Sequence, residues 1–161
     1  MAGARGIPGL GYSAGMGVEE TIAVLLGWAV HLSSYSMPEN LPRVEYRPES
    51  FFIEEVCRSK NCRTLGWYDH KGTVFIDDRL RDRDDRFSRS LLVHEFVHYL
   101  QHQSGRYNAS DCSDHVKRER EAYAIQREYV ARAYGEVAFI RMVLPPCHGS
   151  GERPADANVN K

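Results

Sequence analysis

Apolar residues recur along residues 18–34 with the spacing of one helix face. The stripe consists of Val18, Ile22, Leu25, Ala29 and Leu32. Residues three or four positions apart share a face of a helix, so we expect a first helix over this range. Its apolar stretch, residues 21–32, contains His31 and is too short to span a bilayer.

The middle of the chain has the shorter period of β-strands. TLGWYDHKGTVFIDDRL (64–80) contains two β-prone runs around Asp-His-Lys-Gly, which predicts a hairpin whose second strand is TVFID (73–77). The proline-containing segment 36–48 is expected to be a connection with a short strand around Arg43–Tyr46. The pattern of residues 50–57 fits either a short helix or a strand.

Two longer helices are expected after the hairpin. The first covers about residues 86–103, with Asp84 or Asp85 as its N-cap and Gly105 as its C-terminal stop. The second covers about residues 114–143, where two prolines follow. This order of elements predicts the α+β fold class.

The domain organisation follows from the same pattern. We expect one domain over residues 18–148, because no internal repeat and no second core is visible. The glycine-rich residues 1–17 are expected to be a flexible leader, and the polar residues 149–161 a disordered tail.

The first long helix carries a metal-binding pattern, HEFVH (94–98). His94 and His98 are four residues apart and so lie on one helix face, about 6 Å apart at their β-carbons. Two such imidazoles bind one Zn²⁺ through ring nitrogens at about 2.0–2.1 Å. Glu95 lies beside them, where a base is needed to take a proton from water. The sequence therefore predicts a Zn²⁺ cofactor.

A third ligand is expected from KREREAYAIQ (117–126) on the last helix. His102 is rejected, because it lies about 12 Å along the helix axis from His94. The apolar face of the last helix consists of Ala122, Ile125, Tyr129 and Ala133. Burial of this face turns Glu119 toward the histidines and Glu121 toward solvent. Glu119 is the first choice and Glu121 the second.

These motifs resemble the gluzincin metallopeptidases, which carry H-E-x-x-H on one helix and E-x-x-[AS]-[DEN] on a later one. The matching residues are HEFVH (94–98) and EREAY (119–123). The likeness covers roughly residues 64–135, and the short chain is similar to the minimal forms called minigluzincins. The sequence departs from the family at Tyr123, where an acidic or amide residue often orients a zinc-bound histidine. Either the Tyr123 hydroxyl or another residue must do so here.

The resemblance implies a zincin-like domain, with an N-terminal helix, a small antiparallel sheet, the motif helix and a long third-ligand helix. It also implies hydrolysis of a peptide or protein substrate, with Glu95 as general base and a donor that stabilises the oxyanion. Tyr123 is counted with Glu95 as a candidate catalytic residue, and the oxyanion donor stays open between Tyr123, Tyr107, His115 and His102. Strand 73–77 would be the sheet edge that pairs with an extended peptide, or an ordinary packed strand.

A second hypothesis comes from a different class of function. The domain would bind zinc but be catalytically silent, and would act as a binding module or an effector scaffold. A purely structural zinc is expected to have four protein ligands and no need of Glu95. The sequence therefore favours the enzyme.

The amino-acid composition limits the classes of partner that we expect. The 161 residues are 42% apolar and 27% charged, as in a folded protein with one core. The net charge of −1 leaves no basic surplus for nucleic acid or an anionic membrane, and the arginines of residues 78–89 alternate with aspartates. We expect a monomer with a peptide or protein substrate, without a nucleic-acid partner or a membrane span.

The cysteines indicate the cellular compartment in which the protein is expected. The four cysteines form no C-x2-C pair, so zinc bound by thiolates is not expected. We expect the disulfides Cys57–Cys62 and Cys112–Cys147, which imply a periplasmic or secreted protein.

Overall fold

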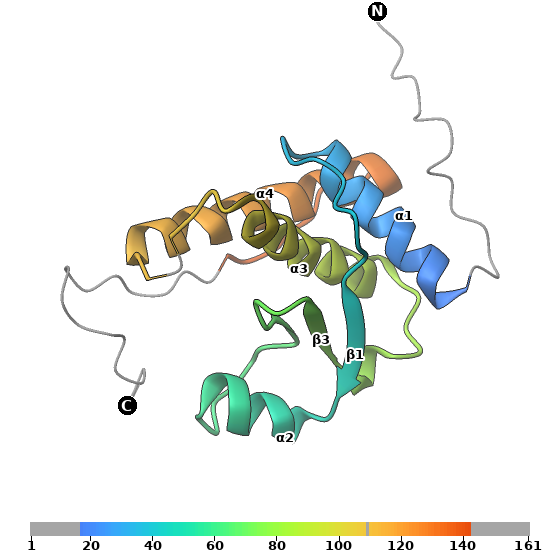
Figure 1. Ribbon diagram of the computed structural model, residues 1–161. Helices are drawn as coiled ribbons and strands as arrows, with labels where there is room; N and C mark the ends of the chain where they lie inside the picture. The colour runs from blue at the N-terminus through green and yellow to red at the C-terminus, as the bar shows by residue number, and fades with distance from the viewer. Residues whose placement is uncertain (1–16, 109, 143–161) are drawn as a thin grey trace, which may run out of the picture.

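The computed structural model describes residues 17–108 and 110–142 and has a mixed α+β architecture (Figure 1). Four α-helical segments and a three-stranded sheet therefore confirm the predicted fold class at this level. The elements, in chain order, are α1 (Val18–His31), β1 (Arg43–Arg47), α2 (Glu49–Phe51), the π-helical segment η1 (Phe52–Cys57), β2 (Gly66–Tyr68), β3 (Thr73–Asp77), the 3₁₀ segment η2 (Asp78–Leu80), α3 (Arg86–Ser104) and α4 (Cys112–Tyr134).

Helix α3 is the central element of the core. It packs against α4 and α1, and also against β2 and β3 of the sheet. Figure 1 shows α1, α3 and α4 grouped together, with the sheet and α2 on the other side of α3. Residues Val93, Phe96 and Val97 of α3 are fully buried, because helices and sheet cover this helix from different sides. A histidine on such a helix must find a polar partner inside the protein.

The predicted hairpin is confirmed, and of the two alternatives for its second strand the structure has the packed strand and not the sheet edge. β2 and β3 pair antiparallel, while β1 pairs with β3 in parallel, so the strand order is β1-β3-β2. β3 is therefore the central strand rather than an edge, and the sheet is mixed rather than antiparallel. The physical reason is β1, whose short RVEYR sequence pairs along the full length of β3. The open edge beside α3 belongs to β2.

The helix boundaries agree with the sequence except at the end of α4. Asp85 caps α3 through a hydrogen bond from the Ser88 backbone N–H, and Gly105 ends that helix with a φ of 62°. Residues 50–57 are helical. Helix α4 ends at Tyr134, not near residue 143, because Gly135 adopts a left-handed φ of 68° and its N–H bonds to the Ala131 carbonyl. This C-terminal glycine cap stops the helix before the prolines.

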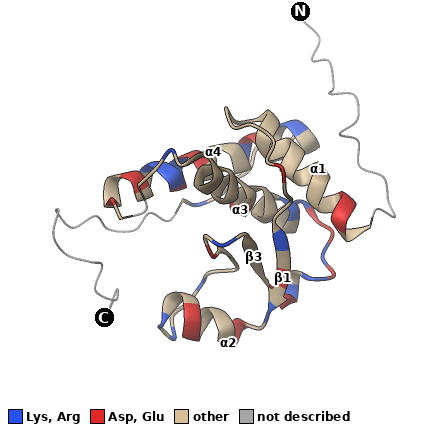
Figure 2. Cartoon of the chain, viewed as in Figure 1, with Lys and Arg blue, Asp and Glu red and all other residues tan. Residues whose placement is uncertain are grey.

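The predicted disulfide Cys57–Cys62 is present and closes the loop after η1. Cys147 lies outside the described residues, so the pairing with Cys112 stays a prediction, as do the leader and the tail. Among residues 17–108 and 110–142, no helix has both the length and the apolar character that crossing a membrane requires. Figure 2 shows acidic and basic residues interspersed along α4.

We predict that the Asp77 carboxylate stabilises the end of β3. Its side chain is 0% exposed and accepts two hydrogen bonds from the Arg79 guanidinium, at 2.8 and 2.7 Å. These bonds lower the pKa of Asp77, so its stabilisation is complete above pH about 4 and is lost as the pH falls through the folded-state pKa. Asp77→Asn should lower the free energy of unfolding at pH 7 by about 1.5–3 kcal/mol.

Urea denaturation followed by circular dichroism at pH 7 and pH 3 measures this effect. The difference between wild type and Asp77→Asn should shrink at pH 3, because there the unfolded chain holds Asp77 protonated and part of the stabilisation is lost. Asp78→Asn, at an exposed neighbouring position, is the matched control and should change stability little. An equal loss at both pH values would show that the charge of Asp77 is not responsible.

Candidate metal centre

Three potential metal ligands converge between α3 and α4. His94 Nε2 and His98 Nε2 are 3.1 Å apart. One carboxylate oxygen of Glu119 lies 3.5 Å from His94 Nε2, and the other lies 3.2 Å from His98 Nε2. One ligand atom from each of these residues falls within 4.8 Å of the other two. The structure thus brings together the two motif histidines and the glutamate that the sequence ranked first.

A glutamine orients the ring of His94. Gln126 Oε1 lies 3.2 Å from His94 Nδ1, while Gln126 Nε2 donates to the Ser90 hydroxyl at 3.2 Å. Since the amide nitrogen is used for Ser90, the amide oxygen faces His94 and accepts a hydrogen bond from Nδ1–H. Gln126 therefore takes the place that the sequence analysis left open between Tyr123 and another residue.

A second glutamine orients His98 in the same way. Gln101 Oε1 lies 2.9 Å from His98 Nδ1. Its Nε2 donates to the Arg118 carbonyl at 3.0 Å and to Glu121 Oε2 at 2.9 Å. The amide oxygen of Gln101 is thereby directed at Nδ1, so His98 also carries its ring proton on Nδ1 and presents Nε2 to the cluster.

Glu121 helps to hold Gln101 in the orientation that faces His98. Its Oε2 accepts hydrogen bonds from the Tyr35 hydroxyl at 2.6 Å and the Tyr107 hydroxyl at 3.2 Å, in addition to the bond from Gln101. Its side chain is 23% exposed. The expectation that Glu121 points to solvent is therefore wrong, although it does point away from the histidines. Its separation from Glu119 by two residues carries it to a different face of α4.

The cluster consists of acceptors that lack a donor. With both ring protons on Nδ1, the two Nε2 lone pairs and the Glu119 carboxylate face one another. Such an arrangement requires a cation between them, either a proton or a metal ion. Tetrahedral zinc with bonds of about 2.0–2.1 Å separates its ligand atoms by about 3.3 Å. The 3.1 Å between the two Nε2 atoms is close to that separation, and each histidine also has one oxygen of Glu119 nearby, at 3.5 Å from His94 and 3.2 Å from His98, so this donor set suits zinc.

The electrostatics of the cluster agree with this need for positive charge. Burial lowers the pKa of His98, but the hydrogen bond and charge of Glu119 outweigh it, and the pKa is raised overall. Burial raises the pKa of Glu119, but His94 and His98, which donate hydrogen bonds to it when a proton is the cation in the cluster, outweigh burial and hold the pKa far below its ordinary value. Glu119 is thus an anion at neutral pH, as a metal ligand must be.

Glu95 lies beside the cluster and under strand β2. It is 4% exposed, and burial raises its pKa against the opposing charges of His94 and His98. A hydrogen bond from the Tyr68 backbone N–H also reaches this carboxylate. A β-carbon at Gly66 would lie only 2.7 Å from Glu95 Oε1. Glycine at this position therefore leaves the room that the carboxylate occupies.

The other candidate residues lie at different distances from the cluster. The Tyr123 ring packs edge-on against His94, with centroids 4.5 Å apart. His115 accepts a hydrogen bond from Arg118 in the first turns of α4. His102 bonds to the Tyr68 hydroxyl through Nδ1 at 2.8 Å, and Tyr107 is engaged by Glu121. Of the four oxyanion candidates, Tyr123 is thus in direct contact with a predicted ligand.

Sequence reasoning missed Gln101 and Gln126, and both carried a signal. Gln126 is seven residues after Glu119, which puts it on the same face of α4 two turns later. Gln101 is three residues after His98 on α3. Each is a polar residue that is buried, at 2% and 4% exposure. A search for amides at these offsets from the ligands would have found them.

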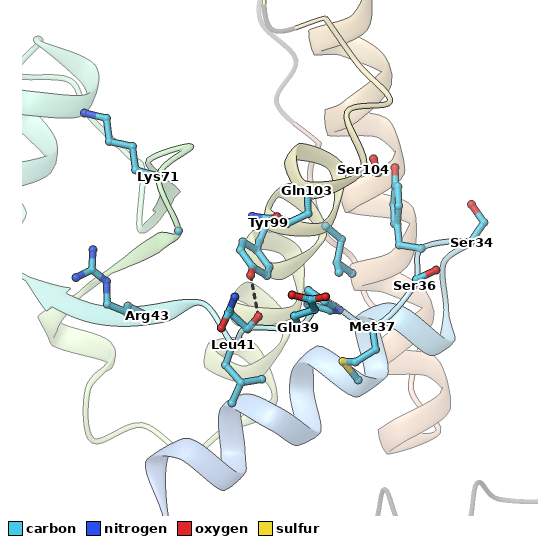
Figure 3. A pocket seen from close by; sticks show the side chains of 15 residues that line it. Ser34, Ser36, Met37, Glu39, Leu41, Arg43, Lys71, Tyr99, Gln103 and Ser104 are labelled. Atoms are coloured by element: carbon cyan, nitrogen blue, oxygen red, sulfur yellow. Dashed lines mark hydrogen bonds between the residues drawn. The ribbon is translucent and has the colours of Figure 1, made fainter.

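A separate pocket of about 730 Å³ lies on another side of α3 (Figure 3). It is lined by the segment 34–41, the β2–β3 turn and the end of α3. Tyr99 lines it and donates a hydrogen bond to the Asn40 carbonyl at 2.8 Å. None of the three clustered ligands lines this pocket, so it is distinct from the metal centre.

Comparison with family models, with curated proteins and with solved structures finds no match for this chain.

We predict a graded loss of zinc from the cluster. His98→Ala and Glu119→Ala each remove one of three protein ligands and should abolish stoichiometric zinc, measured by atomic emission after dialysis. Glu121→Ala keeps all three ligands but frees Gln101, so zinc affinity should fall about 10–100-fold, as for other residues that orient a ligand. Competition with a chromogenic chelator measures this affinity. Full zinc occupancy in Glu119→Ala, or a loss of affinity in Glu121→Ala as large as in Glu119→Ala, would contradict the ligand set.

Proposed function

We propose that this protein is a zinc-dependent metallopeptidase with a zincin-like, gluzincin-type site. The observation that carries the proposal is the convergence of His94, His98 and Glu119 with the buried Glu95 beside them. Three protein ligands leave a tetrahedral metal with one position for water or substrate, which is typical of catalytic zinc. A structural zinc site would use that position for a fourth protein ligand.

The division of chemical roles follows from the positions of the side chains. A zinc ion held by the cluster supplies Lewis-acid chemistry and lowers the pKa of a water molecule in the site. Glu95 takes the proton of the attacking water and returns it to the leaving amine. Its raised pKa suits this exchange, because a base with a very low pKa would accept the proton poorly. Tyr123, whose ring packs against His94, is the proposed donor of a hydrogen bond to the oxyanion.

The edge of β2 is where an extended peptide would pair. Leu65 and Asp69, just outside β2, bond to β3, so the backbone groups of Gly66 and Tyr68 between them point outward. The Tyr68 backbone N–H hydrogen-bonds to Glu95, which shows that this edge faces the candidate base. A peptide added along β2 would therefore pass beside Glu95 and the cluster. The proposal therefore assigns pairing with a peptide to residues 66–68, and not to residues 73–77 as the sequence suggested.

The proposal includes a periplasmic or extracellular site of action. The Cys57–Cys62 disulfide supports it, because such bonds persist in oxidising compartments. The near-neutral charge favours peptide or protein partners rather than nucleic acid. We propose that the chain acts on these as a monomer.

We predict that Glu95→Gln separates catalysis from metal binding. Glutamine keeps the shape of the side chain but cannot take a proton, so zinc should stay stoichiometric while peptide turnover falls about 10²–10⁴-fold. Cleavage of a mixed peptide library, read by mass spectrometry, measures turnover. Glu54→Gln, at an exposed position, is the matched control and should keep full activity. Zinc-loaded wild type that cleaves no peptide would instead support a silent zinc-binding domain.

A second prediction concerns the fit between β2 and Glu95. Gly66→Ala adds a methyl group 2.7 Å from Glu95 Oε1, so the carboxylate must move. Zinc content should stay unchanged, because the three atoms nearest to an added β-carbon all belong to Glu95, while kcat falls at least about tenfold. Gly72→Ala is not suitable as a control, because its φ of 99° strains any other residue. Thr64→Ser, on the same connection, serves instead, and equal kcat values in both variants would contradict the prediction.

A further inference from the structure

One end of the metal centre is bordered by basic groups. Arg118 lies in the second turn of α4, directly before Glu119, and donates a hydrogen bond of 2.7 Å to His115 Nδ1. His70, at the β2–β3 turn, is influenced electrostatically by both Arg118 and His98. The charges of Glu119 and His98 also act on His115, so His70, His115 and Arg118 are close enough to the cluster to interact with it electrostatically.

Arg118 forms no ion pair within 4 Å among the described residues, although its charge also acts on Asp114. The acidic residues near it in sequence are engaged elsewhere: Asp114 pairs with Lys117 at 2.9 Å, Glu119 faces the histidines, and Glu121 pairs with Arg106. The Nε of Arg118 is buried and has no hydrogen-bond partner. A partly buried guanidinium without a carboxylate is costly unless a bound group completes it.

The positive charge of Arg118 acts on a neighbouring histidine. Burial lowers the pKa of His70 to about 4, and repulsion by Arg118 is the next cause. Burial likewise lowers the pKa of His115. Both imidazoles are therefore neutral at pH 7, and Arg118 is the permanent cation of this border. With zinc bound, the two positive charges of the zinc ion and the one of Arg118 would exceed the negative charges of Glu95 and Glu119 by one.

We propose that Arg118 binds a carboxylate of the peptide substrate beside the metal centre, so that the enzyme selects peptides with a carboxylate near the cleaved bond. The planar guanidinium offers paired N–H donors that match a carboxylate. This inference rests on the proposed peptidase function and names its substrate class. The carboxylate is either the C-terminus of the peptide or an Asp or Glu side chain.

The test compares zinc-loaded wild type with Arg118→Gln and Arg118→Met on a mixed peptide library. One half of the library keeps its carboxylates, and in the other half they are converted into methylamides. Mass spectrometry locates each cut relative to the peptide end and to acidic residues, which distinguishes the two sources of the carboxylate. Arg120→Gln is the matched control, since Arg120 is an exposed arginine on the same helix.

Wild type and Arg120→Gln should cleave the carboxylate peptides about 10–100-fold faster than their methylamides, as one charge-assisted pair would give. Both Arg118 variants should lose this preference, mainly through a higher KM, while their zinc content and their cleavage of methylamides stay unchanged. Zinc content and circular dichroism identify a variant that fails to fold, and the other variant then decides.

Equal cleavage of both halves by wild type, or a preference that survives in the Arg118 variants, would overturn the inference and leave the peptidase proposal standing. Absence of any cleavage by zinc-loaded wild type would overturn the proposed function, and this inference with it.

Discussion

The tautomeric state of two histidines is the constraint on which the site depends. Gln126 and Gln101 each present an amide oxygen to a ring Nδ1, and their amide nitrogens are engaged elsewhere. Each imidazole must therefore carry its proton on Nδ1. This leaves both Nε2 lone pairs directed at one point, together with the Glu119 carboxylate. A set of acceptors held this way has no stable arrangement without a cation, and the rest of the fold maintains it.

The packing of α3 against α4 creates this convergence. Ala122, three residues after Glu119, is 0% exposed and lets the two helices approach closely. Ile125 and Tyr129 continue the same face, and their burial sets the rotation of α4. This rotation turns Glu119 toward the histidines and directs Glu121 to Tyr35 and Gln101. Hydrophobic burial thus selects which of the two glutamates reaches the cluster.

The sequence predicted what depends on local periodicity and missed what depends on tertiary pairing. The spacing of His94 and His98 and the stripe through Ala122 are properties of single helices, and they led to the three clustered residues. The central position of β3 depends on its pairing with β1, which is distant in sequence and carries no local signal. Glu121 was placed in solvent, because nothing on α4 indicates that Tyr35 and Gln101 approach it. The predicted end of α4 was wrong for a different reason, because Gly135 is a local stop signal that the prediction did not use.

The candidate site is built from two kinds of secondary structure, a pair of helices and a strand. The clustered ligands and their glutamines all come from α3 and α4, where one helix–helix interface positions them together. The surroundings of Glu95 come instead from β2, through the missing side chain of Gly66 and the Tyr68 backbone N–H. A shift of the sheet would therefore disturb the candidate base and leave the clustered ligands in place. Because the same strand offers the open edge for a peptide, pairing along β2 would act on the position of Glu95 directly. In the proposed enzyme, substrate binding and placement of the base are thus coupled through one short strand, while metal binding is independent of both.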